Sequence, residues 1–74
     1  MRESTLKAVQ GAISLLDRDA ILLVAVYPGH EEGRLEGEML TEYFSTLNRY
    51  KICATEVRIV NSPTSPFFFV LETK

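Results

Sequence analysis

The chain has few of the residues that hold very small proteins together through covalent bonds or metal ions. Among its 74 residues are one cysteine, Cys53, one histidine, His30, and no tryptophan. A lone cysteine excludes an internal disulfide, and with one histidine it cannot complete the ligand set of a structural zinc site. Packing of apolar side chains must therefore stabilise the fold, and at this length the core is marginal.

Long apolar runs and an excess of basic charge are also absent. The longest apolar run, residues 20–27, is far shorter than the roughly 20 residues that span a bilayer, and no signal-type apolar stretch follows the N-terminus. The formal net charge of -2 and the pI near 5.3 argue against a free-standing nucleic-acid module, whose phosphate contacts usually need a basic patch. We expect a cytoplasmic protein without membrane contact, in which any RNA contact is local or shared with another polypeptide.

The composition is that of an ordinary globular protein. Hydrophobic residues make up 46% of the chain and charged residues 24%, with a mean hydropathy of +0.03. These values exclude a disordered or collagen-like chain. No internal repeat, low-complexity tract or linker divides the sequence. We therefore expect one domain over residues 1–74.

Hydrophobic periodicity predicts two helices. Apolar residues recur at helical spacing over 5–16, and Ser4 or Thr5 can cap this helix by accepting a backbone N–H. A second apolar stripe, with charged residues on the opposite side, covers 35–47 and is the clearest helical pattern in the chain.

Three further segments have the patterns of strands. Residues 21–26 are apolar at every position, which predicts a strand buried on both faces. Residues 50–60 alternate with a period of two, and 67–71 are aromatic and β-branched. A helical crossover makes the first two strands parallel, whereas the short proline-containing link 61–66 permits an antiparallel return. We expect an α/β fold in the order helix, strand, helix, strand, strand, with a three-stranded mixed sheet.

This topology can place both helices on one face of the sheet and leave the other face bare. The residues left uncovered would be the outer side chains of 21–26 and 67–71. Apolar faces larger than a few hundred Å² are seldom left in water. We therefore expect either a homo-oligomer or a missing stretch of chain to cover this face, so that the domain is a partial one.

The loop Tyr27–Gly33 is the first candidate site. It follows the buried strand, and ligands of open α/β sheets bind beyond the carboxyl ends of the strands. His30 can accept a proton or donate a hydrogen bond near neutral pH, and Gly29 allows backbone conformations that other residues resist. The alternative is a polar loop whose histidine is merely exposed.

The segment after the second strand is the second candidate site. If the first two strands are parallel, Asn61 lies at the same sheet edge as Tyr27. The Asn61 amide can pair with a base edge, and Phe67 or Tyr27 can offer a stacking surface. Alternatively, Asn61 only shapes the turn by bonding its own backbone, and the phenylalanine run 67–69 belongs to the core.

Other patterns that carry chemistry are missing or are better explained by structure. Cys53 is interpreted as a small strand residue, and the glutamates between 31 and 38 as a solvated helix face rather than a metal site. The glycines form neither a G-x-G-x-x-G nor a P-loop pattern, so no nucleotide cradle is predicted. We expect no cofactor and no metal to bind this chain alone.

In combination, three segments resemble the C-terminal portion of the bacterial rRNA methylase family. They are Ser4–Leu6, Tyr27–Gly33 and Asn61–Phe67, followed by the terminal Val-Leu-Glu-Thr-Lys, so the resemblance spans essentially all 74 residues. It implies the C-terminal half of a Rossmann-like class I methyltransferase, with 67–71 inserted antiparallel between the other two strands. In the full family the N-terminal half supplies further helices and the neighbouring strand, which would explain an uncovered sheet face.

The resemblance also implies an activity. Family enzymes depend on S-adenosylmethionine, and characterised members methylate an aminomethyl uridine at the tRNA wobble position. Their cofactor loop lies in the N-terminal half, so the resemblance implies no catalysis by this chain alone and leaves tRNA or rRNA as the substrate. It implies a catalytic, proton-accepting role for His30. The residues that it assigns to the substrate side are Tyr27, Gly29, His30, Asn61, Pro66 and Phe67.

Two hypotheses from different classes follow. The first is the substrate-side part of an RNA methyltransferase, which lacks the cofactor-binding motif and is inactive without the other half. The second is a non-catalytic α/β module that associates with itself or with a partner through its open sheet edge or face, because exposed edge strands pair readily. Light scattering discriminates between them, since a monodisperse dimer favours the module.

Overall fold

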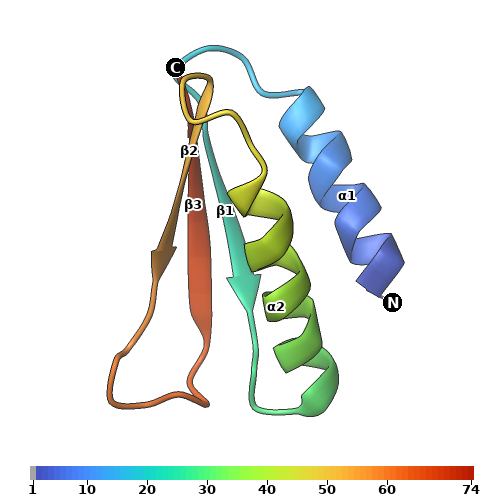
Figure 1. Ribbon diagram of the computed structural model, residues 1–74, viewed down its shortest axis with the longest axis vertical. Coiled ribbons are helices and arrows are strands. Elements are labelled where there is room, and N and C mark those ends of the chain that lie inside the picture. The colour runs from blue at the N-terminus through green and yellow to red at the C-terminus, as the bar shows by residue number, and fades with distance from the viewer. Residues whose placement is uncertain (1) are drawn as a thin grey trace.

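Two helices lie on the same side of a three-stranded sheet in the computed structural model, which describes residues 2–74 (Figure 1). Met1 lies outside the described residues. The elements in chain order are α1 (Arg2–Ser14), β1 (Ile21–Val26), α2 (Glu31–Ser45), β2 (Ile52–Val57) and β3 (Phe67–Thr73). Their types and order confirm the predicted α/β fold. Neither helix of this described part is long and apolar enough to cross a membrane.

The sheet has the order β1-β3-β2, with β3 antiparallel to both of its neighbours. β1 and β2 therefore run in the same direction, as the crossover predicts, and β3 is inserted between them. The expected mixed sheet needs a correction, because the central position of β3 keeps β1 and β2 from pairing. Both hydrogen-bonded ladders are antiparallel.

The core lies between the helices and the inner face of the sheet. The Phe69 ring meets Phe44 at 4.9 Å and Phe67 at 5.5 Å between centroids, both in edge-to-face contacts. Gly37 lets α2 approach the sheet, since a Cβ atom there would lie 3.1 Å from Cγ1 of Val26. The buried apolar residues are Val9, Val26, Leu40, Phe44, Phe67, Phe69 and Leu71.

Helix boundaries differ from the predictions at their N-terminal ends. Ser4 and Thr5 lie inside α1 rather than capping it, because the helix already includes Arg2. α2 begins at Glu31, earlier than the apolar stripe suggests, because His30 caps it.

Strand β1 is covered on one face only. Val26 is 3% exposed toward the helices, whereas Ile21 and Leu23 are each 63% exposed on the outer face. The prediction of burial on both faces is therefore wrong for the described residues, because both helices pack on the same side (Figure 1). The accompanying prediction, that one sheet face is left bare, is confirmed.

Candidate functional site

Two loops converge at one end of the sheet, as the strand directions predict. Val26 and Phe67 are register partners, so the loop after β1 leaves the sheet beside the point where the β2–β3 loop enters it. Gly29 approaches the second loop, since a Cβ atom on it would lie 3.7 Å from the carbonyl oxygen of Thr64. The sequence pattern contains no signal for this contact with Thr64. We call the exposed surface formed by residues 27–30 and 61–66 the rim.

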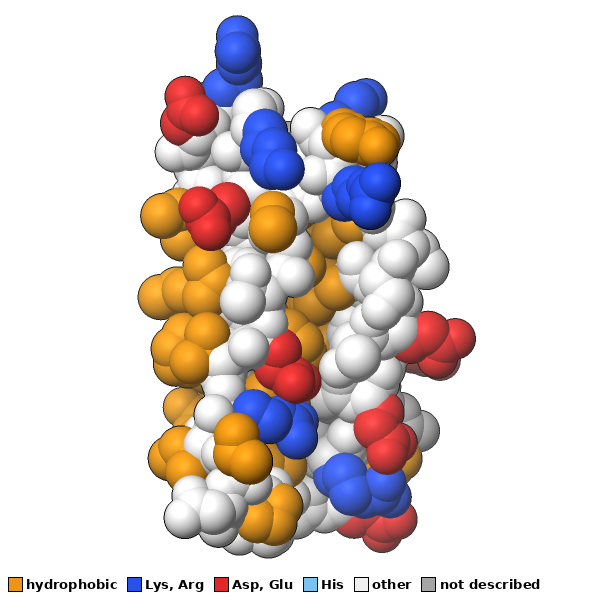
Figure 2. Space-filling model, turned by 60° about the vertical axis from the view of Figure 1, so that its left-hand side comes forward, with side chains coloured by type: hydrophobic (Ala, Val, Ile, Leu, Met, Phe, Trp, Pro, Cys, Tyr) orange, Lys and Arg blue, Asp and Glu red, His pale blue; other side chains and the backbone are white. Residues whose placement is uncertain are grey.

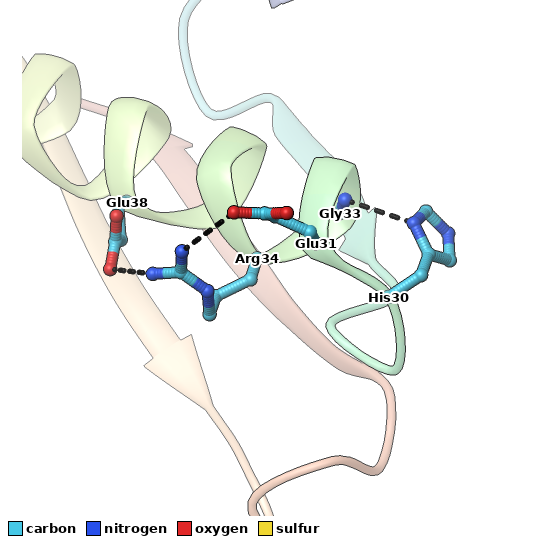
Figure 3. Close-up of polar contacts among 5 residues, drawn as sticks. All are labelled: His30, Glu31, Gly33, Arg34 and Glu38. Carbon is cyan, nitrogen blue, oxygen red and sulfur yellow. Dashed lines mark hydrogen bonds and ion pairs between the residues drawn. The ribbon is translucent and has the colours of Figure 1, made fainter.

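His30 is the N-cap of α2. Its Nδ1 accepts a hydrogen bond from the backbone N–H of Gly33 at 3.2 Å (Figure 3). A nitrogen that accepts is unprotonated, so the neutral ring carries its proton on Nε2. His30 therefore presents its Nε2–H to solvent as a hydrogen-bond donor. For Nε2 to accept a proton, the ring proton would have to move to Nδ1, which would break the hydrogen bond from the Gly33 N–H.

The main chain of Tyr27 is fixed against the first turn of α2, while its side chain remains free. A Cβ atom on Gly33 would lie 1.8 Å from the Tyr27 carbonyl oxygen, so only glycine fits there. The Tyr27 residue is 61% exposed. A shallow hollow of about 190 Å³ lies beside it and is lined by Ala25, Val26, Tyr27, His30, Gly33 and Glu36.

Asn61 and Pro66 are exposed in the second loop. The turn is held by its backbone, with Ser62 N–H donating to the Ile59 carbonyl at 3.2 Å and Ser65 N–H to the Ser62 carbonyl at 3.1 Å. Within the described residues the Asn61 side chain has no hydrogen-bond partner. The alternative that Asn61 shapes the turn by bonding its own backbone is therefore not observed, and its amide is free to meet a ligand.

Phe67 is only 7% exposed and lies in the core rather than on the rim. The Arg58 guanidinium sits 4.7 Å from its ring centroid and is held by Glu56, with 3.1 Å between Nε and Oε2. Phe67 reaches solvent through a groove of about 440 Å³ between α2 and the second loop. Figure 2 shows apolar side chains at the floor of a hollow beside the sheet. Of the two aromatic residues predicted to stack on a base, Tyr27 is therefore the accessible one.

Basic charge near the rim is neutralised locally. Arg34 contacts Glu38 at 2.8 Å and Glu31 at 3.7 Å (Figure 3). These pairs are separated by three and four residues along α2, a spacing that brings side chains together on a helix. Together with the Arg58–Glu56 pair, they leave no basic patch around the rim, among the described residues, to attract phosphate groups.

The N-terminal end of α2 does not fit the S-adenosylmethionine implied by the resemblance. Its methionine carboxylate would suit a free helix N-terminus, but the first turn of α2 is capped by His30 and carries Glu31 and Glu32. A Cβ atom on Gly29 would have its nearest neighbour at 3.7 Å, which is an ordinary contact distance. Gly29 therefore does not mark a tight backbone site that a side chain would block. Over residues 2–74, no cluster of three His, Cys, Asp or Glu side chains could hold a metal ion either.

A comparison with known protein families identifies the family of this chain. The family model described as "Putative rRNA methylase" matches residues 1–72, which includes both helices, β1, β2, nearly all of β3 and both loops of the rim. The match covers well over half of the chain. The chain therefore belongs to the rRNA methylase family.

Proposed function

We propose that this chain forms the substrate side of an S-adenosylmethionine-dependent RNA methyltransferase and that the rim holds the acceptor nucleoside. The observation that carries the proposal is the convergence of two loops that leave Tyr27, His30 and Asn61 exposed at one end of the sheet. Family membership supports methyl transfer as the chemistry.

The three exposed side chains suit a uridine. The Tyr27 ring offers a stacking surface, since RNA-binding proteins recognise unpaired bases by stacking on aromatic rings. The edge of uracil presents one N–H between two carbonyl oxygens, and the Asn61 amide supplies both an acceptor and donors. The Nε2–H of His30 can donate to a second oxygen of the nucleoside. The rim thus recognises the base through stacking and hydrogen bonds rather than through charge.

The methyl donor is not held by the described residues. S-adenosylmethionine supplies an electrophilic methyl group when it is bound, and polypeptide outside residues 2–74 must supply its pocket. The contribution of this chain is orientation, because fixing the acceptor atom in line with a donor converts a bimolecular reaction into an effectively unimolecular one. Without a donor pocket, we expect no catalysis by residues 2–74 alone.

Binding of an RNA stem-loop with an aminomethyl uridine in its loop tests the proposal. Asn61→Asp replaces the amide donors with a carboxylate and should weaken binding about tenfold, as expected when a polar group at a recognition site is left unpaired. Asn48→Asp is the matched control, because it adds the same charge before β2 rather than after it. The control also keeps a side-chain oxygen at the position where the Asn48 Oδ1 accepts the Tyr50 N–H.

A second pair of variants tests the stacking surface. Tyr27→Ala should weaken binding about tenfold, within the range measured for base–aromatic stacking. Tyr50→Ala removes a tyrosine that is 73% exposed beyond the opposite end of the sheet, and it should leave the affinity unchanged. Equal losses for Tyr27→Ala and Tyr50→Ala, or for Asn61→Asp and Asn48→Asp, would contradict the proposal. The same stem-loop without the aminomethyl group shows whether the modification itself is recognised.

A further inference from the structure

Glu36 is placed differently from the glutamates that follow it in α2. It is half-buried where α2 lies beside α1 (Figure 1), whereas Glu38 and Glu42 are exposed. The Oε2 atom of Glu36 accepts a hydrogen bond from the hydroxyl of Thr5 in α1 at 3.2 Å. The neighbouring helix therefore holds this carboxylate in place.

No basic side chain of the described residues forms an ion pair with Glu36. Arg34, two positions away in the same helix, pairs with Glu31 and Glu38 instead. Within residues 2–74 the Thr5 hydroxyl is the single hydrogen-bond donor to Glu36. Partial burial removes water from a carboxylate and raises the free-energy cost of its charge, unless a cation compensates it. A cationic ligand group would provide that compensation.

Glu36 lines the same hollow as Tyr27 and His30 of the rim. The volume of the hollow is about 190 Å³, whereas pockets that enclose drug-sized ligands hold roughly 300–1,000 Å³. The hollow therefore has room for a short substituent rather than for a whole nucleoside. A base that stacks on the exposed Tyr27 ring would place such a substituent beside the Glu36 carboxylate.

We infer that the hollow is a subsite for an alkylammonium group carried by the bound base and that Glu36 binds this group. The inference rests on the proposed function, in which the rim holds the acceptor nucleoside. An alkylammonium group donates up to three hydrogen bonds, and the Oε1 atom of Glu36 has no partner among the described residues. Such a bond is charge-assisted and about twice as strong as a neutral one. The rim thus recognises the base, and the hollow recognises its substituent.

The lining of the hollow disfavours other occupants. Ala25, Val26 and Gly33 contribute no polar side-chain atom, and Glu36 is the only acidic residue of the lining. An anionic substituent, such as a carboxymethyl group, would be repelled by the like charge, which adds specificity. A metal ion is disfavoured as well, because three ligand side chains do not gather anywhere in the described part of the chain.

Two RNA stem-loops that differ in one functional group test the subsite. One carries 5-aminomethyluridine in its loop, and the other carries 5-hydroxymethyluridine, whose substituent is neutral and of similar size. The purified chain should bind the aminomethyl stem-loop about tenfold more tightly, as expected for one hydrogen bond between charged groups. The ratio of the two Kd values is the readout, because contacts to the phosphate backbone contribute equally to both.

Glu36→Gln should abolish this preference. It keeps the length of the side chain and an oxygen that can accept the Thr5 hydrogen bond, but it removes the charge, so the ratio should fall below about twofold. Glu42→Gln is the matched control, because it removes the same charge from an exposed position that lines the groove on the other side of α2. Its ratio should stay near tenfold. Circular dichroism shows whether each variant remains folded.

The carbon NMR signal of the Glu36 side-chain carboxylate gives a second readout. It should shift when the aminomethyl stem-loop is added but not with the hydroxymethyl one. An equal fall of the ratio in Glu36→Gln and Glu42→Gln would overturn the inference, because the preference would then come from overall charge. Equal Kd values for both stem-loops, each weakened by Tyr27→Ala, would overturn the subsite and leave the proposed function intact. Failure of both stem-loops to bind would overturn both proposals.

Discussion

Gly33 lies directly against the main-chain carbonyl of Tyr27. A Cβ atom on Gly33 would come within 1.8 Å of that oxygen, and no glycine among the described residues has a positive φ. Glycine is therefore required here for space rather than for an unusual backbone conformation. The contact joins the loop after β1 to the first turn of α2, and it sets where the Tyr27 and His30 side chains are presented.

Gly33→Ala should destabilise the protein and displace the loop. A methyl group cannot coexist with the Tyr27 carbonyl, so the loop or the first turn of α2 must move, at a cost of about 3 kcal/mol in the free energy of unfolding. Gly11→Ala is the control, because no atom lies within 4 Å of its Cβ position. That change in α1 should raise stability by about 1 kcal/mol. Urea unfolding measures both, and a neutral Gly33→Ala would contradict the structure of the loop.

Substitutions of His30 should separate its structural role from its role in binding. His30→Ala removes the cap acceptor and should lower the free energy of unfolding by about 1 kcal/mol. His30→Asp restores an acceptor for the Gly33 N–H and should recover that stability. It does not restore the Nε2–H donor, so binding of the RNA stem-loop should remain weak. Recovery of both properties by aspartate would show that His30 acts only as a cap.

The hydroxyl of Thr73 links the end of β3 to the segment before β1. It accepts the backbone N–H of Ala20 at 2.8 Å and donates to the carbonyl oxygen of Asp17. Thr73→Val keeps the shape but removes both hydrogen bonds, and it should lower the free energy of unfolding by about 2 kcal/mol. Thr64→Val is the control, because the Thr64 side chain is exposed in the second loop. Equal stabilities of the two variants in urea would contradict this role of Thr73.

Much of the fold could be predicted because the apolar patterns and the turn residues indicate the same element boundaries. The strand Ile21–Val26 has the predicted bounds, since it is a continuous apolar run that ends before Pro28 and Gly29. Its burial could not be predicted correctly, because an entirely apolar strand indicates two covered faces and the described helices cover one. The start of α2 at Glu31 could not be predicted either, because its N-cap is His30 and histidine is not among the residues that commonly cap helices.

The location of the candidate site could be predicted better than its details. The direction of the first two strands places Tyr27 and Asn61 at the same end of the sheet, and the structure has this arrangement. The contact of Gly29 with Thr64 and the stacking of Arg58 on Phe67 depend on loop conformations that no local pattern encodes. The burial of Phe67 follows from its place in the central strand of the sheet.

A single NMR titration of the isotopically labelled chain tests the central claim most directly. The backbone amide signals are followed while the aminomethyl uridine stem-loop is added to one sample and S-adenosylmethionine to another. We predict that the RNA shifts the amides of Tyr27, Gly29, His30 and Asn61 but not that of Tyr50, and that S-adenosylmethionine shifts none of them. RNA shifts away from the rim, or saturable shifts with S-adenosylmethionine at micromolar concentrations, would contradict a substrate side without a donor pocket.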